Sequence, residues 1–196
     1  QMSLLRGGTE MKKDFGKKTF LFPMPVLIIG TYNLDGSANA MNAAWGGIYN
    51  DGKISICVDK GHKTVANIKQ RKAFTVSVAD FDHIPQCDYV GIVSGNSVSN
   101  KVEKAGFTSS KSNFVDAPVI NELKMVLECE LISYDEKTEQ LIGNIINVAA
   151  DDSVLTNGNI DPEKLKPITY DPVNKNYIQL GKIVGKAFFD GKKIKG

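Results

Sequence analysis

The fold is decided by residues 26–46, which read VLIIGTYNLDGSANAMNAAWG. Val26–Tyr32 is an apolar run rich in β-branched residues, and such runs favour strands. Asp35-Gly36 follows this run, and the dipeptide is typical of tight β-hairpin turns. The chain then returns over Ser37–Tyr49, so the stretch predicts two neighbouring antiparallel strands.

The same strand–turn–strand pattern recurs further along the chain. Asn50-Asp51-Gly52-Lys53 is a second turn signal, and Ile54–Val58 after it alternates in polarity as a half-buried strand does. Met125–Tyr134 and Gln140–Ala150 flank a third polar turn, and Tyr177–Leu180 reads as a late strand.

Helical signals are few and short. Thr64–Lys72 has apolar residues three positions apart and a threonine that can cap its start. A second helix is expected to end at Ala105, closed by Gly106, and Asp161-Pro162-Glu163 opens a third. We therefore predict a mainly β (α+β) fold, an antiparallel barrel or sandwich with a few short flanking helices.

Composition narrows the class of protein. The 196 residues suit one domain, and 24 basic against 22 acidic residues give a net charge of +2. Only Arg6 and Arg71 are arginines, whereas proteins that read double helices rely on arginine, so we expect no nucleic-acid partner.

The sequence also argues against a membrane or extracellular protein. The longest apolar stretch, Phe20–Ile29, contains two prolines and is too short to span a bilayer. Three widely spaced cysteines form neither a disulfide framework nor a four-thiolate metal site, so we expect a cytoplasmic protein. We expect Cys57 and Cys129 in the core and Cys87 to be partly exposed.

Several common catalytic motifs are absent from the sequence. It contains no GxxxxGK[ST], GxGxxG, HExxH or GxSxG, and His62 and His83 are its only histidines. We therefore expect no metal site, and an enzyme of this sequence would take its reactivity from a bound organic cofactor.

Asn39–Gly47 stands where a strand is expected but consists mainly of Ala, Asn and Gly, which are weak strand formers. Small side chains let a flat group approach the backbone, whose N–H groups can then meet the oxygens and nitrogens of a heterocycle. The alternative interpretation is a crowded barrel interior, where another element approaches the strand.

Lys60-Gly61-His62-Lys63-Thr64 lies at the start of the first predicted helix. A helix N-terminus offers unpaired N–H groups and a positive partial charge, to which Lys63 adds a full charge and Thr64 a hydroxyl. The alternative interpretation is an ordinary capped loop. Together, a ring-binding strand and a phosphate-binding helix start indicate a site for flavin mononucleotide (FMN).

With these segments the sequence resembles the flavin reductase-like, FMN-binding split-barrel family, and in particular its flavoredoxin branch. The matching residues run from about position 20 to about position 190 and are Phe22-Pro23-Met24-Pro25-Val26, Gly30-Thr31-Tyr32, Asn39–Gly47, His62-Lys63-Thr64 with Asn67-Ile68, Asp88-Tyr89, Ser94-Gly95, Lys101–Gly106, Asp116-Ala117-Pro118, Leu127-Glu128-Cys129, Gly143, Leu180-Gly181 and Gly185–Phe188.

The resemblance implies a six-stranded split barrel that works as a homodimer with FMN at the dimer interface. We expect residues 1–19 to be a leader or N-terminal arm, partly of vector origin because Met11 can be the natural start, and residues 20–196 to be a single FMN-binding domain.

The resemblance also assigns site residues. The isoalloxazine ring and the ribityl chain would be lined by Asn39, Ala40, Met41, Asn42, Ala43, Ala44 and Trp45, although core packing is an equal alternative for Trp45. Many relatives carry Thr where this chain has Asn42, and an amide beside the ring would alter the redox potential.

The phosphate would be held by His62, Lys63 and Thr64, with Ser94 and Lys101 nearby. The carboxy-terminal stretch around Tyr177 and Lys186 would reach the flavin of the partner. No catalytic side chain and no metal ligand is assigned, because flavin N5 carries the chemistry.

The implied function is that of an FMN-dependent oxidoreductase. Hydride or electrons would pass from NADH or NADPH, a transient donor, through FMN to a free flavin, a ferric complex or a protein. The alternatives are a non-enzymatic FMN electron carrier that is reduced by a protein donor and a flavin-free scaffold barrel.

Overall fold

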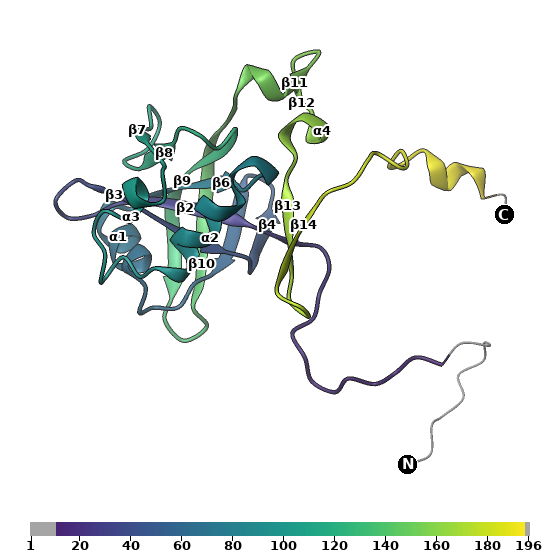
Figure 1. Cartoon of the computed structure of the whole chain (residues 1–196), viewed down its shortest axis with the longest axis horizontal. Helices are drawn as coiled ribbons and strands as arrows, with labels where there is room; N and C mark the ends of the chain where they lie inside the picture. The colour runs from purple at the N-terminus through teal and green to yellow at the C-terminus, as the bar shows by residue number, and fades with distance from the viewer. Residues whose placement is uncertain (1–10, 195–196) are drawn as a thin grey trace.

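The computed structural model describes residues 11–194, so the expected leader at residues 1–10 lies outside the described residues. One curled sheet with short helices on its outer side forms the body, and an extended segment leaves it near each end of the chain (Figure 1).

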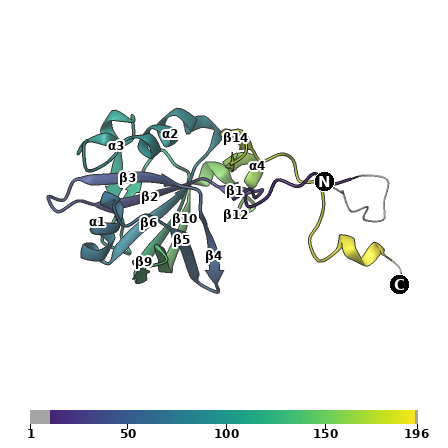
Figure 2. The same ribbon diagram turned by 90° about the horizontal axis from the view of Figure 1, so that it is seen from below.

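The main sheet has the strand order β3-β2-β6-β9-β10-β5-β4, and every neighbouring pair is antiparallel. Its strands are β2 (Leu27–Tyr32), β3 (Ala38–Ala43), β4 (Gly46–Asn50), β5 (Lys53–Cys57), β6 (Ala73–Val78), β9 (Met125–Asp135) and β10 (Gln140–Ala150). Figure 2 shows the sheet from below, with β3 and β4 spread apart at its two margins. This confirms the predicted mainly β fold, an antiparallel split barrel with a few short helices.

The sheet has seven strands rather than the six that the resemblance implied. The difference arises because the predicted strand Ser37–Tyr49 breaks at Ala44 and Trp45 into β3 and β4. These two strands pair with different partners, β3 with β2 and β4 with β5, so the chain crosses from one margin of the sheet to the other at this break.

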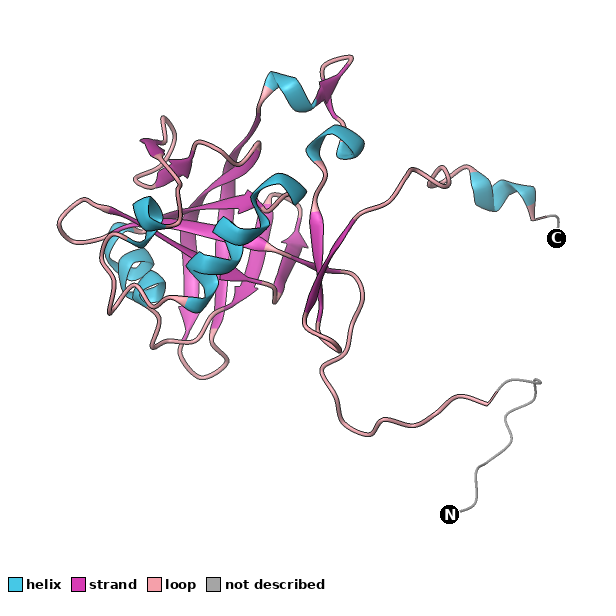
Figure 3. Ribbon diagram, in the orientation of Figure 1, coloured by secondary structure: helices cyan, strands magenta, loops and turns pink. Residues whose placement is uncertain are grey.

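Short elements complete the described part of the chain (Figure 3). The helices are α1 (Lys63–Arg71), α2 (Ile84–Ile92), α3 (Lys101–Lys104) and α4 (Pro162–Leu165), with 3₁₀ turns at Phe81–His83, Asp152–Val154 and Asp190–Lys193. The remaining strands are β1 (Met24–Pro25), β7 (Ser109–Lys111), β8 (Pro118–Ile120), β11 (Leu155–Thr156), β12 (Asn159–Ile160), β13 (Ile168–Asp171) and β14 (Asn176–Gln179).

Two apolar cores lie on the two faces of β2 and β3. The inner core fills the half-barrel, and α1 adds Val65 and Ile68 to it. The outer core lies between the sheet and the helices α2 and α3, which add Cys87, Val90 and Val102. Because β2 and β3 are covered on both faces, their side chains are almost entirely buried.

Helix α2 was not among the helices expected from the sequence, and two cysteines lie elsewhere than expected. Pro85 stands in the first turn of α2, where a proline is well tolerated. Cys87 lies on the face of α2 that packs against the sheet, so it is buried, and burial raises the pKa of its thiol to about 12. Cys57 ends β5 and is exposed.

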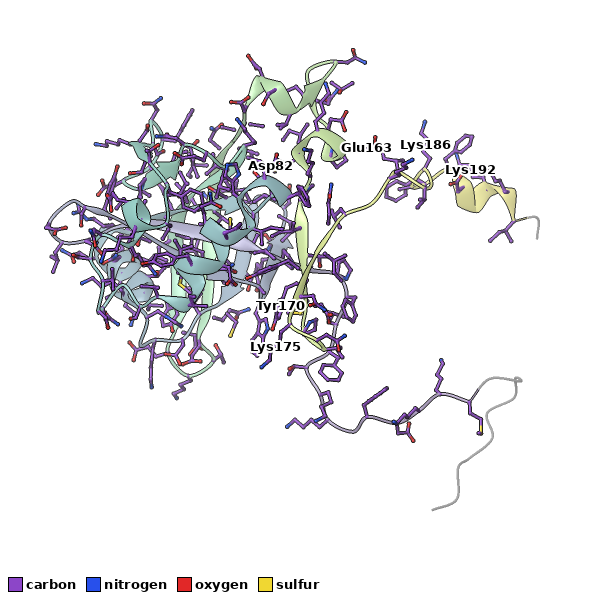
Figure 4. The ribbon with its side chains drawn as sticks, in the orientation of Figure 1. Asp82, Glu163, Tyr170, Lys175, Lys186 and Lys192 are labelled. Carbon is purple, nitrogen blue, oxygen red and sulfur yellow. The ribbon has the colours of Figure 1, made fainter. Side chains whose placement is uncertain are left out.

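An N-terminal arm (residues 11–23) and a C-terminal arm (residues 181–194) leave the body. Both consist almost entirely of exposed residues. Figure 4 places Lys186 and Lys192 on the C-terminal arm, away from the sheet. After Leu180 the arm keeps one hydrogen bond to the body within the described residues, from the Ile183 amide to the Glu163 carboxylate at 3.2 Å. Among these residues, none of the helices has the length and apolar character that a bilayer crossing requires.

Candidate functional site

The expected ring-binding strand is β3, and its side chains are packed more tightly than the ligand interpretation requires. Met41 and Ala43 point into the inner core, whereas Ala38 and Ala40 face the outer core. Helix α2 approaches β3 closely through a glycine of its own. A Cβ on Gly91 of α2 would lie only 2.9 Å from the Cβ of Asn42. The side chains of residues 38–41 therefore lie in the interior, and binding of a ring by this strand stays a prediction.

Access to β3 opens at its C-terminal end. Residues 38–41 are buried, whereas Asn42 and Ala44 are partly exposed and Trp45 is 53% exposed. Within residues 11–194, the backbone of residues 38–44 makes no hydrogen bond to any element except β2. The outer edge of this strand thus has unused backbone donors and acceptors where solvent begins to reach it.

Trp45 lies between two hollows rather than in a core, so the core-packing alternative is wrong. One hollow, of about 390 Å³, is lined by Lys18, Thr19, Phe20, Leu21, Pro23, Met24, Pro25, Ala44, Trp45 and Gly46. The other, of about 520 Å³, is lined by Trp45, Gly46, Gly47, Ile48, Tyr49, Ser55, Cys57, Thr138 and Gln140. The indole can therefore serve as one wall of a ring-binding site.

The expected phosphate-binding segment forms the N-terminus of the nine-residue helix α1. No side chain caps this end, and its first turn holds no acidic residue. Lys63 is the first helical residue and half-buried, while His62 just before it is exposed. The helix N-terminus and the Lys63 ammonium together make this end of α1 positive, although the Asp35 carboxylate also interacts with that ammonium.

Asn39 joins this helix start to β3. Its side-chain amide donates a hydrogen bond of 3.1 Å to the hydroxyl of Thr64, and both residues are buried. The loop around Gly95 closes over the same place, because a Cβ on Gly95 would lie 2.4 Å from the Asn39 Oδ1 and 3.2 Å from the Lys63 Cβ. Ser94, which precedes Gly95, is exposed at this loop.

Asn96 fixes that loop to the helix start and was not singled out from the sequence. Its amide donates to the carbonyl of Gly61 at 3.1 Å, and its backbone N–H donates to the Ser94 hydroxyl at 3.2 Å. Its place after Ser94-Gly95, which the sequence did single out, was the available signal. The structure therefore brings Asn39, Lys63, Thr64 and the Ser94 loop together.

Lys101 and Asn42 both donate hydrogen bonds at α2. The Lys101 ammonium donates to the carbonyls of Val90 and Val93 at 3.1 and 2.9 Å, where it caps the C-terminal end of α2. The Asn42 amide donates to the Cys87 carbonyl at 3.0 Å. One hydrogen of the Asn42 amide thus holds α2 on the sheet, while its second hydrogen and its Oδ1 have no hydrogen-bond partner among residues 11–194, so an influence of this amide on a flavin ring stays a prediction.

Burial lowers the pKa of Lys101 from its ordinary 10.5 to about 8. Between these values the unfolded chain binds more protons than the folded one, so the free energy of unfolding rises with pH across that window. We expect the unfolding free energy of the wild-type protein, taken relative to that of the Lys101→Met variant, to increase as the pH rises from 7.5 to about 10. Denaturant unfolding of both proteins at each pH measures this difference. Parallel stability curves for the two proteins would contradict this.

Tyr177 and Lys186 were expected to reach the site of a partner subunit. Tyr177 on β14 donates a hydrogen bond of 2.5 Å to the carboxylate of Asp88 on α2, and burial together with this bond raises the pKa of its phenol. Tyr177 thus joins the three-stranded sheet β1-β13-β14 to α2, and its ring centroid lies 6.4 Å from that of Tyr170. Lys186 lies on the C-terminal arm, away from the site of its own chain.

The residues present fit a bound FMN. A phosphate needs a positive, donor-rich pocket, which α1 supplies with its uncapped N-terminus and Lys63. A flavin ring needs backbone donors and a flat wall, which the open end of β3 and Trp45 supply. Both features lie along β3, because Asn39 on this strand is hydrogen-bonded to Thr64 and the strand continues from there to its open end at Ala44 and Trp45.

The chain is similar in sequence and fold to several known proteins. The sequence profile described as "Flavin reductase like domain" matches residues 19–172. Flavoredoxin of Desulfovibrio vulgaris (Miyazaki F) superposes with a TM-score of 0.89 at 36% identity, over 92% of this chain and all of that one. Flavoredoxin from Methanosarcina acetivorans gives a TM-score of 0.84 at 28% identity, over 94% and 99% of the two chains.

A more distant likeness concerns the fold alone. Nitrilotriacetate monooxygenase component B from Bacillus cereus superposes with a TM-score of 0.75 at 20% identity, over 92% of this chain and 100% of that one.

Proposed function

This chain belongs to the flavin reductase-like family, in its flavoredoxin branch, and we propose that it binds FMN to pass electrons from NADH or NADPH to an acceptor. The fold supports flavin-based oxidoreduction or electron transfer. The observation that carries the finer proposal is the hydrogen bond between Asn39 and Thr64, which joins a strand edge with free donors to an uncapped helix start.

Different residues of the chain would bind the phosphate and the ring of FMN. Lys63, Thr64, His62 and the α1 N–H groups would bind the phosphate, and Ser94 would border it. The backbone of Asn42–Trp45 would donate to the ring, while the Trp45 indole would cover part of it. When bound, FMN supplies the capacity to accept a hydride or single electrons and to release them singly or in pairs.

Backbone donors beside the ring would stabilise negative charge that develops there, because they are already oriented before the reaction. The sequence contains no dinucleotide-binding fingerprint, so a nicotinamide nucleotide would have to bind at the FMN site itself. The acceptor would be a small molecule, such as free flavin or a ferric complex, or a protein.

We further propose that the protein is a homodimer. β4 exposes Ile48 and Tyr49, β10 exposes Val148, and the C-terminal arm exposes Val184 and Phe188, the last two to 98% and 99%. Apolar side chains exposed to this degree are typical of surfaces that another chain covers. A second copy at these surfaces would also close the open side of Trp45.

Purified protein is expected to be yellow, to release FMN on denaturation, and to lose its flavin absorbance when NADH or NADPH is added anaerobically. An absorption spectrum, mass spectrometry of the chromophore and stopped-flow reduction measure these three points. A colourless protein that takes up no FMN would contradict the proposal and favour the flavin-free scaffold.

The second candidate is an FMN electron carrier that receives electrons from a protein donor. The lack of a dinucleotide fingerprint favours it, because nothing in the chain is dedicated to the nicotinamide nucleotide. Rapid FMN reduction by a ferredoxin-like donor, together with negligible reduction by both nucleotides, would establish the carrier and exclude the reductase.

A further inference from the structure

A buried network of side-chain hydrogen bonds lies behind the N-terminus of α1. It joins β2, the turn after β2, β3 and α1, and every member is more than 90% buried. The members and their exposed fractions are Thr31 (0%), Asn33 (7%), Asn39 (2%), Thr64 (1%) and Asn67 (3%). Buried polar side chains are unfavourable unless they are hydrogen-bonded, so the hydrogen bonds among these five side chains restrict their positions.

The amides of Asn39 and Asn67 use all their hydrogens inside the network. The Asn67 amide donates to the Thr31 hydroxyl at 3.0 Å and to the side-chain Oδ1 of Asn33 at 2.9 Å. The Asn39 amide donates to the same Thr31 hydroxyl at 3.4 Å and to the Thr64 hydroxyl at 3.1 Å. Thr31 therefore accepts two bonds and lies between the two amides.

This arrangement decides what the Thr64 hydroxyl can do. A hydroxyl has one proton to donate and two lone pairs to accept with. Because Asn39 donates to it, the Thr64 oxygen is an acceptor on that side, and its proton has no acceptor within residues 11–194. A 99% buried hydroxyl thus keeps an unused donor at the uncapped start of α1.

We propose that Asn67 and Thr31 are positioning residues that make the protein select phosphorylated flavin over riboflavin. They hold the Asn39 amide so that it donates to Thr64, and Thr64 in turn donates to the phosphate. This proposal rests on the proposed function, since it assigns the phosphate to the N-terminus of α1. None of the positioning residues needs to touch the ligand.

The test compares the affinities for FMN and for riboflavin, which differ only in the phosphate. Thr31→Val keeps the shape of the side chain but removes the hydroxyl, so we expect FMN affinity to fall about tenfold while riboflavin affinity stays the same. Thr31→Ser restores the hydroxyl and is expected to restore FMN affinity. Flavin fluorescence titrations of each variant with both ligands measure the ratio.

Thr75→Val is the matched control. Thr75 is also 0% exposed, lies on the adjacent strand β6, and donates its hydroxyl to the Pro118 carbonyl at 2.6 Å, outside the network. Its replacement removes an equally buried hydrogen bond and is expected to leave the affinity ratio unchanged. If Thr31→Val does not fold, Asn67→Ser provides the same comparison from the other side of the network.

The outcomes separate the two proposals. Equal losses for FMN and riboflavin in Thr31→Val, or no loss for either, would overturn the positioning role while leaving FMN binding by the wild type intact. Failure of Thr31→Ser to recover FMN affinity would also overturn it. A wild-type protein that binds neither flavin would overturn the proposed function and the positioning role with it.

Discussion

The Lys63→Ala variant is expected to bind FMN about 10- to 150-fold more weakly than the wild type, a loss of about 1.5–3 kcal/mol. Lys63 begins α1, whose N-terminus has no capping side chain and whose first turn has no acidic residue. Its ammonium is the full charge at this helix start, so its removal takes away one charge-assisted bond to a phosphate. Titration of flavin-free protein with FMN measures the change.

Lys69→Ala is the control for this variant. Lys69 lies in the last turn of the same helix, where its ammonium pairs with the exposed carboxylate of Glu136. It shares the helix and the charge of Lys63 but not the proximity to the N-terminus, so its loss should leave FMN affinity within about twofold, as expected for an exposed surface pair. Unchanged affinity in Lys63→Ala would place the phosphate elsewhere.

The Phe74→Ala variant is expected to lose about 3–5 kcal/mol of unfolding free energy, a large part of the roughly 5–15 kcal/mol that a domain has. Phe74 on β6 is fully buried in the inner core. On β10 a glycine makes room for its ring, because a Cβ on Gly143 would lie 2.4 Å from the Phe74 Cζ. The two positions fit each other closely, so alanine would leave a cavity that the rigid sheet cannot close.

Urea unfolding followed by circular dichroism measures this loss. Phe114→Ala is the control, since Phe114 lies in a loop and is 56% exposed, and its replacement should change stability by no more than about 0.5 kcal/mol. A loss below about 1 kcal/mol in Phe74→Ala would contradict the close fit, because it would mean that the half-barrel collapses around the missing ring.

Strands with strong local signals were predictable from sequence. The predicted strand Gln140–Ala150 is confirmed as β10, with both bounds correct. A long apolar run bounded by turn residues is compatible with few other structures. The break between β3 and β4 was not predictable, because nothing local in Ala44-Trp45 specifies it. It depends on the closure of the whole sheet, which moves the chain from one margin to the other.

Only part of the candidate site was predictable, because local patterns are visible in the sequence and the packing of distant elements is not. The motif at Lys63 and Thr64 depends on one helix start, so a local pattern sufficed to find that helix start. The interactions of Lys101 and Asn42 depend on where α2 packs, and α2 itself was missed because its stability comes from burial against β3. Binding of FMN by any of these residues stays a prediction until it is measured.

The C-terminal arm has a practical consequence for handling the protein. Lys182, Lys186, Lys192 and Lys193 lie in a fully solvated segment, the kind of backbone that trypsin cleaves first. If a second copy covers the arm, the rate of nicking at these lysines falls as the concentration is raised. Cleavage of the C-terminal arm would then report subunit assembly, and gel electrophoresis would measure it without any label.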